Sequence, residues 1–450
     1  MAPVLILGMV PPSVTDRLRS YFRRSSFYTY LLNVTSLSSN LAQEYQASLD
    51  FSNKHNLHAV IPWEKMDSFG EARKIVVLDL GGTNLNLFEV EIHGQKEAEV
   101  IRTGSLDFYQ DKVYTPEILF ADLKNQLDHF ILDSQERMDL KHIVFIFSYQ
   151  MDQFVREDGY VDAVCTYFGK MRKSDGLVGA QIGLPFEKFL QQSGYPNVKV
   201  AVTNDTIIYG LASKSYEINH GDDLYDAGMN IIVGTGANIG VLFDQKDEQG
   251  SLGLRVINTE FCDYKSVELS KFDKIFDSQS DSPGRYLMEK MISGTWMHQI
   301  FKVILKDLIE QKLINPEVLN MMNLNTIDSE QIDHLMRSTD FNSEDKEALY
   351  FIWREINKRG GNLSGMVMAV MMVDVYKKLG KDLARIIITE TGSVFKKNIR
   401  FRESLFDSLD RELGRLGFGD KIQYKFVNLS DRAALGAVVF DTYFNRPKTK

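Results

Sequence analysis

Cysteine is scarce in this sequence, with only Cys165 and Cys262 among 450 residues. Two cysteines this far apart give neither a disulfide framework nor a metal-binding pattern, and such scarcity suits a reducing compartment. No apolar run approaches the roughly 20 residues that a membrane-spanning helix needs. Positive charge is not in excess either, since the formal net charge is −9, and a nucleic-acid partner would require a basic surface. The sequence therefore predicts a protein with no membrane span and no nucleic-acid partner.

A short apolar run, PVLILGMV, occupies residues 3–10. It has the length of a signal-peptide core, but no Lys or Arg precedes it, and Pro11 and Pro12 follow without a clear small-residue cleavage site. We therefore expect a cytoplasmic protein, with secretion as the alternative if this run is a signal peptide.

The length of 450 residues exceeds what one hydrophobic core usually serves, so two lobes are expected. Short apolar runs bounded by turn residues predict strands at 74–80, 85–92, 143–147, 198–202, 230–243 (with a central turn) and 384–389. Longer stretches with helical periodicity predict helices within 15–53, 287–313, 344–379 and 431–443. Strands mixed with helices in this way indicate an α/β protein.

Two glycine-rich turns stand between predicted strands. The first is LDLGGTN at 78–84, where Gly81 and Gly82 let a phosphate approach the backbone and Thr83 and Asn84 add side-chain donors. Asp79 ends the preceding strand, where it could hold a water on Mg²⁺. A plain hairpin turn is the alternative, and a Walker P-loop is excluded because no Lys is present and a strand follows.

The second turn is VGTGAN at 233–238, which includes Thr235 and Gly236. Two strand–turn–strand units about 150 residues apart suggest two lobes that grip one polyphosphate from opposite sides.

A third segment, VTNDT at 202–206, follows another predicted strand. Asp205 could accept a proton from a substrate hydroxyl while Asn204 orients the substrate. A turn or a helix cap is the commoner role for such a pair. Glu260 and Glu289 are further acidic candidates for sugar hydroxyls, although isolated glutamates are usually solvated.

Five segments together resemble the eukaryotic hexokinase and glucokinase family, in its order and at its spacing, from about residue 60 to 440. They are LDLGGTN (78–84), VTNDT (202–206), VGTGAN (233–238), VINTEF (256–261) and PGRYLMEKMISG (283–294).

The resemblance implies a two-lobed fold of the actin-like and sugar-kinase ATPase class, with a cleft between a small and a large domain. Residues 1–73 would form an N-terminal helical segment packed on the large lobe, 74–205 the small lobe and 206–435 the large lobe. Residues 436–450 would form a C-terminal helix and tail that return toward the small lobe.

The resemblance also implies an activity, which is ATP-dependent phosphorylation of glucose or a related hexose as the first step of glycolysis. Asp205 would be the general base, and Mg²⁺ would be held by ATP and by waters near Asp79 and Asp205. The sugar hydroxyls would be bound by Ser148, Lys170, Asn204, Asn238, Glu260 and Glu289. Mg-ATP would be bound by Asp79, Gly81, Gly82, Thr83, Asn84, Thr235, Gly236, Gly392 and Ser393.

The chain departs from the family pattern at several of these segments. Asn86 stands where the family usually carries Arg, and Gln150 where it carries Pro. The sugar segment Trp-Thr-Lys reads Phe168-Gly169-Lys170, and the Gly-Ser pair near the adenosine reads Arg432-Ala433. We expect Arg432 at the surface, with stacking on adenine as the alternative.

Three hypotheses follow, led by an active hexokinase that is a monomer or a homodimer. The second is a sugar-binding regulatory protein with weak or no catalysis, motivated by Asn86 and by the altered adenosine segment. The third is an actin-like or chaperone-type ATPase, which would share the glycine turns and hydrolyse ATP without regard to sugar.

Overall fold

The computed structural model describes residues 13–28, 34–49, 61–62, 69–82, 84–94, 97–108, 112–168, 173–220, 225–246, 252–324, 326–335 and 343–444. Contacts divide the chain into two compact units of three segments each. The helical unit comprises Met1–Leu41, Cys262–Val367 and Lys396–Leu409. The sheet unit comprises Ala42–Phe261, Met368–Phe395 and Asp410–Lys450. The lobe boundaries near residues 73, 205 and 435 stay a prediction.

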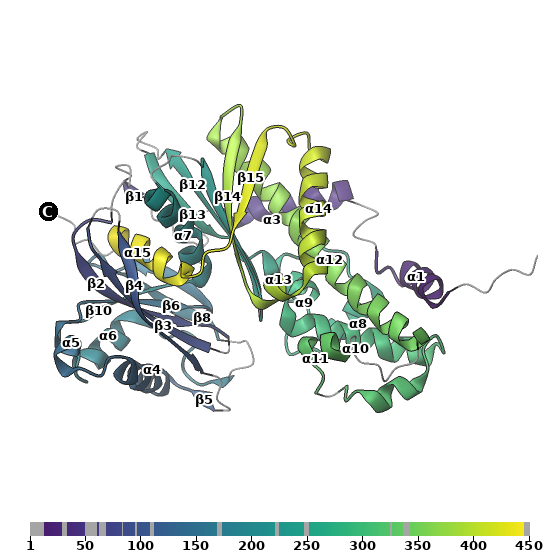
Figure 1. The fold of residues 1–450 in the computed structure, drawn as a ribbon, viewed down its shortest axis with the longest axis horizontal. Coiled ribbons are helices and arrows are strands. Elements are labelled where there is room, and N and C mark those ends of the chain that lie inside the picture. Colours follow the sequence, from purple (N-terminus) through teal and green to yellow (C-terminus); the bar gives the residue numbers. More distant parts are fainter. Residues whose placement is uncertain are drawn as a thin grey trace, which may run out of the picture. The chain divides into compact units, whose positions relative to one another are not determined.

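The sheet unit contains a five-stranded sheet in the order β10-β6-β2-β3-β4 (Figure 1). Strand β2 pairs antiparallel with β3 and parallel with β6, which places the ends of β2, β6 and β10 at one edge. The strands are β2 (Arg73–Leu80), β3 (Asn84–Ile92), β4 (Ala98–Asp107), β6 (His142–Phe147) and β10 (Lys199–Thr203). Four of them confirm predicted strands; β4 was not predicted.

A six-stranded sheet in the order β1-β13-β12-β11-β14-β15 belongs to the same unit. Its strands are β1 (Ile61–Pro62), β11 (Ala227–Val233), β12 (Ala237–Lys246), β13 (Leu252–Asn258), β14 (Ala384–Thr391) and β15 (Ile422–Val427). The β11–β12 hairpin and β14 confirm the strands predicted at 230–243 and 384–389.

Smaller elements of the sheet unit surround the five-stranded sheet. They are the hairpin β7 (Gln150–Val155) and β8 (Val161–Tyr167), the short pair β5 (Val113–Tyr114) and β9 (Lys173–Ser174), and the helices α4 (Pro116–Phe130), α5 (Ser134–Asp139) and α6 (Gly183–Gln191). The apolar side chains of α4 and α6 pack with those of β2 and β6 in one core cluster.

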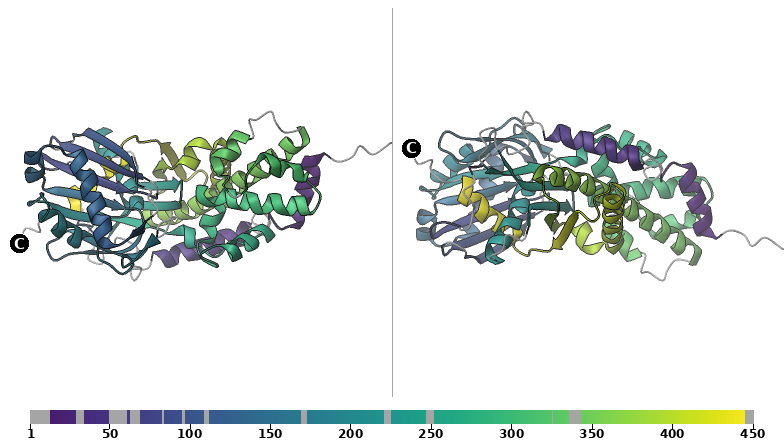
Figure 2. Two further views of the ribbon diagram at one scale, coloured as in Figure 1. Left: turned by 90° about the horizontal axis from the view of Figure 1, so that it is seen from below. Right: turned by 90° about the horizontal axis from the view of Figure 1, so that it is seen from above.

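Two helices join the two sheets of this unit. The helix α7 (Asp205–His220) packs on β11, β12, β13 and β14, and α15 (Arg432–Phe444) packs on α7, β2, β3 and β4. In Figures 1 and 2 the yellow α15 lies across the blue strands. The two helices approach closely at Gly436, where an added Cβ would lie 2.0 Å from the carbonyl oxygen of Ile208. The position of α15 confirms the helix predicted at 431–443.

The helical unit is built from amphipathic helices that share a core of apolar side chains. Its helices are α1 (Val14–Arg24), α8 (Lys271–Gln279), α9 (Leu287–Ile292), α10 (Gly294–Glu310) and α11 (Ser329–Leu335), with 3₁₀ turns at Phe261–Asp263 and Pro316–Met321. Three helices run through both units: α3 (Val34–Ser48), α12 (Ser343–Leu379) and α14 (Ile399–Arg415). The short α13 (Ser393–Lys397) precedes α14.

The helical stretch predicted at 287–313 is confirmed, although it is not one continuous helix. The stretch 287–313 forms two helices because Ser293 has an extended backbone, with φ −87° and ψ 154°, between α9 and α10. The helix predicted at 344–379 is confirmed as α12. Of the helical region 15–53, the described residues form α1 and α3; residues 29–33 and 50–53 lie outside the description. Among the helices described, none is long and apolar enough to cross a membrane.

Candidate functional site

The first glycine turn joins β2 to β3 in the sheet unit. The Gly81 N–H donates to the carbonyl oxygen of Asn84 over 2.9 Å and so closes the turn. Asp79, the second-to-last residue of β2, is buried opposite Asn86 in the β2–β3 register. Thr83 lies outside the described residues. The predicted carboxylate therefore does lie beside the glycine turn.

Asp79 is held by two donors from different elements. Asn86 Nδ2 lies 3.3 Å and the Tyr209 hydroxyl of α7 lies 3.1 Å from Asp79 Oδ2. Burial and the negative charge of Asp205 raise the pKa of Asp79 to about 6, against the opposing effect of both donors and of Arg432. Burial together with the charges of Asp79 and Asp205 raises the pKa of Tyr209 well above its ordinary value, so its hydroxyl remains a donor. The structure thus brings Asp79 and Asp205 close enough to repel each other.

Asn204 and Asp205 lie where β10 passes into α7. Asn204 Oδ1 accepts from the Thr206 N–H over 2.8 Å, so Asn204 caps the helix. Asp205 Oδ1 accepts from the same N–H over 2.7 Å and from the Thr206 hydroxyl over 3.3 Å. Among the described residues nothing donates to Asp205 Oδ2. The capping interpretation is confirmed for Asn204, while Asp205 keeps one oxygen available as a proton acceptor.

An amide and carboxylate cluster forms where β12 and β13 meet the loop after β13. Glu260 Oε1 accepts from Asn258 Nδ2 over 2.7 Å and from Asn238 Nδ2 over 3.2 Å. Gln150 Nε2 lies 3.3 Å from Glu260 Oε2. Glu260 itself has a left-handed backbone, with φ +46°. The structure brings the predicted Asn238 and Glu260 together and adds two residues whose role the sequence did not indicate, Gln150 and Asn258.

The segment 148–150, which follows β6, touches each part of this site. The Ser148 N–H donates to the carbonyl oxygen of Leu80 over 3.2 Å. The Tyr149 hydroxyl donates to the carbonyl oxygen of Gly81 over 3.3 Å. Asn204 Nδ2 lies 3.5 Å from the carbonyl oxygen of Tyr149. Since Gln150 reaches the amide and carboxylate cluster, three consecutive residues connect the glycine turn, the Asn204–Asp205 pair and Glu260.

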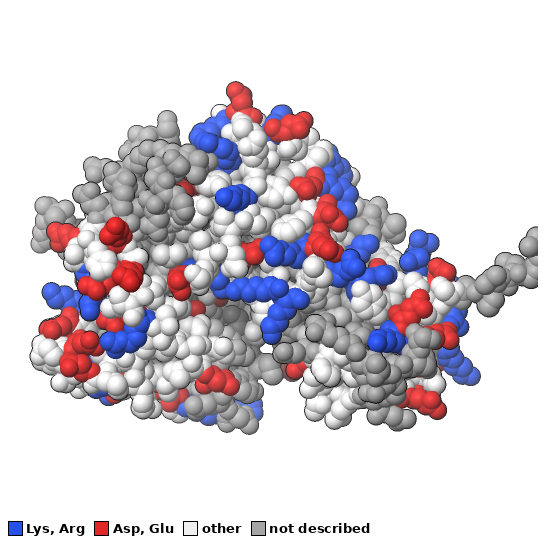
Figure 3. Space-filling view, in the orientation of Figure 1, with Lys and Arg blue, Asp and Glu red and all other residues white. Residues whose placement is uncertain are grey.

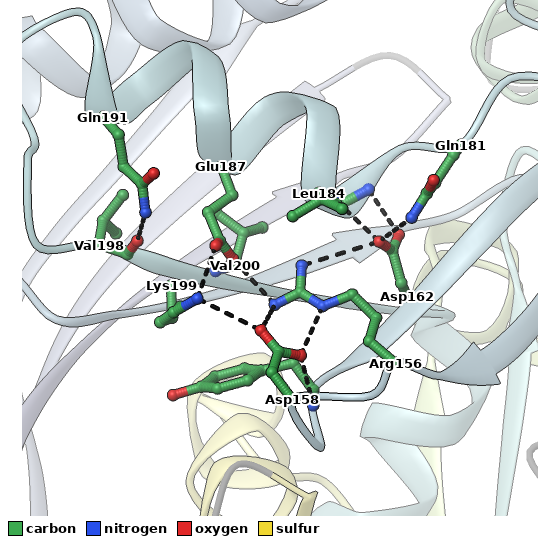
Figure 4. A network of polar contacts seen from close by, with 12 residues as sticks. Arg156, Asp158, Asp162, Gln181, Leu184, Glu187, Gln191, Val198, Lys199 and Val200 are labelled. Carbon is green, nitrogen blue, oxygen red and sulfur yellow. Dashed lines mark hydrogen bonds and ion pairs between the residues drawn. The ribbon is translucent and has the colours of Figure 1, made fainter.

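The hairpin that begins with Gln150 is anchored by a charged network (Figure 4). The Arg156 guanidinium, after β7, donates to Asp158 over 2.9 Å and to Glu187 of α6 over 2.9 Å. Asp162 of β8 accepts from the N–H groups at the start of α6, and Lys199 of β10 pairs with Glu187 over 3.0 Å. The network ties β7, β8, α6 and β10 together at the turn end of the hairpin, while Gln150 lies at the opposite end, paired with Tyr167.

The second glycine turn joins β11 to β12 and carries Thr235 and Gly236. The Gly234 N–H donates to the carbonyl oxygen of Gly236 over 2.8 Å. Gly392, with φ +105°, packs on this turn so closely that an added Cβ would lie 2.1 Å from the carbonyl oxygen of Val233. Ser393 follows at the start of α13. The structure therefore brings the predicted Gly392–Ser393 pair to the predicted second turn.

Two predicted sugar ligands are not among the residues that the structure brings together in the sheet unit. Glu289 is half-buried on α9, in the helical unit. Lys170, with Gly169, lies outside the described residues. Arg432 is half-buried at the start of α15, with its guanidinium carbon 5.3 Å from the centre of the Tyr209 ring.

A cavity of about 830 Å³ lies in the helical unit. Side chains of α1, α12 and α14 line it, among them Arg19, Arg354 and Arg400. Figure 3 shows Lys and Arg side chains gathered over α12 and α14 on one face. None of the predicted site residues lines this cavity, so its size does not identify it as the site.

The carboxylates at the first turn fit a hydrated Mg²⁺. The negative charge of Asp205 disfavours the ionisation of Asp79, and a cation between a phosphate and these groups would relieve that repulsion. Within the described ranges no three His, Cys, Asp or Glu side chains form a direct metal cage. Asp79 and Asp205 are thus the residues that would hold such an ion, through its waters.

Comparison with known proteins finds two family models, both described as hexokinase, which match residues 24–216 and 228–441. Human Hexokinase-2 is 26% identical over 378 residues, which cover 76% of this chain but only 39% of the human protein. The chain thus spans well under half of that relative. Hexokinase-9 of Oryza sativa subsp. japonica is 24% identical over 456 residues, which cover 90% of this chain and 86% of the rice protein.

Among solved structures, a hexokinase from Schistosoma mansoni complexed with glucose superimposes with a TM-score of 0.71. It is 22% identical and is matched over 94% of this chain and 99% of its own. A second hexokinase crystal structure gives a TM-score of 0.64 at 17% identity, matched over 96% of each chain. These likenesses confirm the predicted fold class, the actin-like sugar-kinase ATPase fold.

Proposed function

This chain belongs to the hexokinase family, and on that premise we propose that it transfers the γ-phosphoryl group of Mg-ATP to the 6-hydroxyl of glucose or a related hexose. The observation that carries the proposal is the segment 148–150, whose contacts connect the first glycine turn, Asn204 (the neighbour of Asp205) and the Glu260 cluster within one compact unit. Phosphoryl transfer depends chiefly on positioning and charge neutralisation.

Sugar binding is assigned to the amide and carboxylate cluster. Neutral hydroxyls need both donors and acceptors once water is excluded, and Asn238, Asn258, Gln150 and Glu260 supply both. Their mutual hydrogen bonds fix the side chains before the sugar arrives, which reduces the entropy lost on binding. Ser148, Asn204, Lys170 and Glu289 are proposed as further sugar ligands.

Proton transfer is assigned to Asp205. Its Oδ1 is held by Thr206, and its Oδ2 accepts the proton of the sugar 6-hydroxyl as that oxygen bonds to the γ-phosphorus and ADP leaves. The Mg²⁺ ion bound with ATP neutralises phosphate charge. Asp79, Gly81, Gly82, Thr83 and Asn84 are proposed to line the phosphates from the first turn. Thr235 and Gly236 would do so from the second turn, with Gly392 and Ser393 near the adenosine.

A sugar-binding regulatory protein remains the second candidate. It is favoured by one observation, the bulky Arg432 where the family resemblance implies a small residue near the adenosine. Calorimetry separates the two functions, because a regulator would bind glucose but not Mg-ATP. A role in glycolysis, a cytoplasmic location and a monomeric or homodimeric state are part of the leading proposal.

The test is ADP release from Mg-ATP by the purified protein, with and without glucose. The Asp205→Ala variant should lose about 10²–10⁴-fold in kcat, the usual contribution of a general base. Asp420→Ala, at an exposed position before β15, is the matched control and should retain wild-type turnover. Glucose-independent hydrolysis would instead favour the actin-like ATPase. Undiminished turnover by Asp205→Ala would refute the assigned base.

A further inference from the structure

Arg432 begins α15 beside the first glycine turn. Its guanidinium carbon lies 5.3 Å from the centre of the Tyr209 ring, and the Tyr209 hydroxyl donates to Asp79 over 3.1 Å. A cation, an aromatic ring and a carboxylate therefore follow one another from α15 through α7 to β2. Arg432 Nη1 donates to the carbonyl oxygen of Leu429 over 3.0 Å, which fixes the side chain. Its Nε is buried, and no described residue accepts a hydrogen bond from it.

The carboxylates near the first glycine turn would repel phosphate groups unless a cation offsets their charge. Asp79 and Asp205 would both repel a triphosphate, and Asn86, which contacts Asp79, is uncharged. The guanidinium charge of Arg432 acts on Asp79 and on Tyr209 in the direction opposite to these carboxylates. A cation over an aromatic face in a partly desolvated site is stabilised by that face as well.

We propose that Arg432 is the positioning cation of the first glycine turn. It holds Tyr209 against Asp79 and offsets the charge of the two carboxylates, so that a magnesium-bound nucleotide triphosphate can approach. This inference rests on the proposed function, because it assumes that the turn binds the phosphates of ATP. On this proposal the bulky side chain at position 432 promotes nucleotide binding and does not block it.

The test is calorimetric binding of the ATP analogue AMPPNP with Mg²⁺, which needs no turnover. Arg432→Ala should weaken binding about tenfold. Arg432→Lys should recover part of that loss, because lysine keeps the charge but lacks the planar guanidinium that lies over the Tyr209 ring. Arg385→Ala is the matched control, since Arg385 of β14 is exposed and its guanidinium lies 3.6 Å from Asp226. Glucose affinity should stay unchanged in all three variants, which also shows that they are folded.

A double-mutant cycle tests whether Arg432 acts through the Tyr209 hydroxyl. Tyr209→Phe removes the hydroxyl bond to Asp79, and its effect on AMPPNP binding should not add to that of Arg432→Ala. If the wild type binds the nucleotide and Arg432→Ala binds equally or more tightly, Arg432 is an obstruction and the inference is overturned while the kinase proposal stands. If neither protein binds nucleotide although both bind glucose, the proposed kinase function fails, and the inference with it.

Discussion

Glu260 combines an unfavourable backbone with three side-chain hydrogen bonds. Its φ of +46° is in the left-handed region, which costs a residue with a Cβ about 1–2 kcal/mol. Its carboxylate meanwhile accepts from Asn238, Asn258 and Gln150. Strain of this kind persists where the surrounding structure imposes it, and it is common in binding sites. The VINTEF segment identified the residue, but nothing in the sequence indicated its backbone.

Replacing Glu260 should separate stability from binding. Glu260→Gly and Glu260→Ala should both weaken glucose binding, by about 10–100-fold for the loss of charged hydrogen bonds. The free energy of unfolding of Glu260→Gly should nevertheless be higher than that of Glu260→Ala by about 1 kcal/mol, because glycine adopts the left-handed backbone without strain. Glu289, on α9, is the matched position, and there Ala should be more stable than Gly. Equal stability of the two Glu260 variants in urea denaturation would contradict the strain argument.

Asp79 should make stability fall as pH rises. Its folded pKa of about 6 exceeds the unfolded value of about 3.9, so between pH 4 and 6 the folded state keeps a proton that the unfolded state releases. The cost is absent below pH 4 and complete above pH 6, where it is on the order of 3 kcal/mol.

Asp79→Asn removes this titration. Urea denaturation should show the variant gaining stability over the wild type from pH 4 to pH 7, although it should bind Mg-ATP poorly. A stability difference that is the same at both pH values would show that Asp79 does not titrate in this range.

Close helix packing at Gly436 fixes α15 against α7. Any side chain there would meet the Ile208 carbonyl oxygen at 2.0 Å, so the backbones must separate to accept one. Gly436→Ala should therefore destabilise the protein by about 1–3 kcal/mol despite the better helix propensity of alanine.

Gly414 is the matched control for this substitution. It lies within α14 with no atom within 4 Å of an added Cβ, so Gly414→Ala should stabilise by about 0.5–1 kcal/mol. Thermal denaturation of both variants measures these opposite changes in stability. If Gly436→Ala were stabilising, the contact between α15 and α7 at Gly436 would be looser than described.

Several elements could be predicted because their residues show the required pattern locally. The continuous apolar runs of β2 and β6 are typical of buried strands, and they were recognised. Strand β4 was not recognised, because Arg102, Gly104 and Ser105 interrupt its apolar positions. Its side chains are exposed because it lies at the edge of the sheet, which local sequence does not reveal. The break at Ser293 was missed because the flanking residues continue a helical pattern.

At the scale of the whole molecule, each unit joins three distant segments of chain. The glycine turns and the Asn204–Asp205 pair were found from short motifs, because each motif is contiguous. The contacts of Gln150 with Glu260 and of Arg432 with Tyr209 were not, since 110 and 223 residues separate the partners and local pattern says nothing about such pairs.

The packing of α15 on α7 and on β2 to β4 has a consequence for biosynthesis. A ribosome makes those strands and α7 long before it makes Arg432–Phe444. Until those last turns emerge, the apolar surfaces that α15 covers remain exposed on the nascent chain, where they invite association with other chains or with chaperones. The sheet unit can therefore be completed only after translation has passed α15, and a ribosome stalled before that point would hold an aggregation-prone chain.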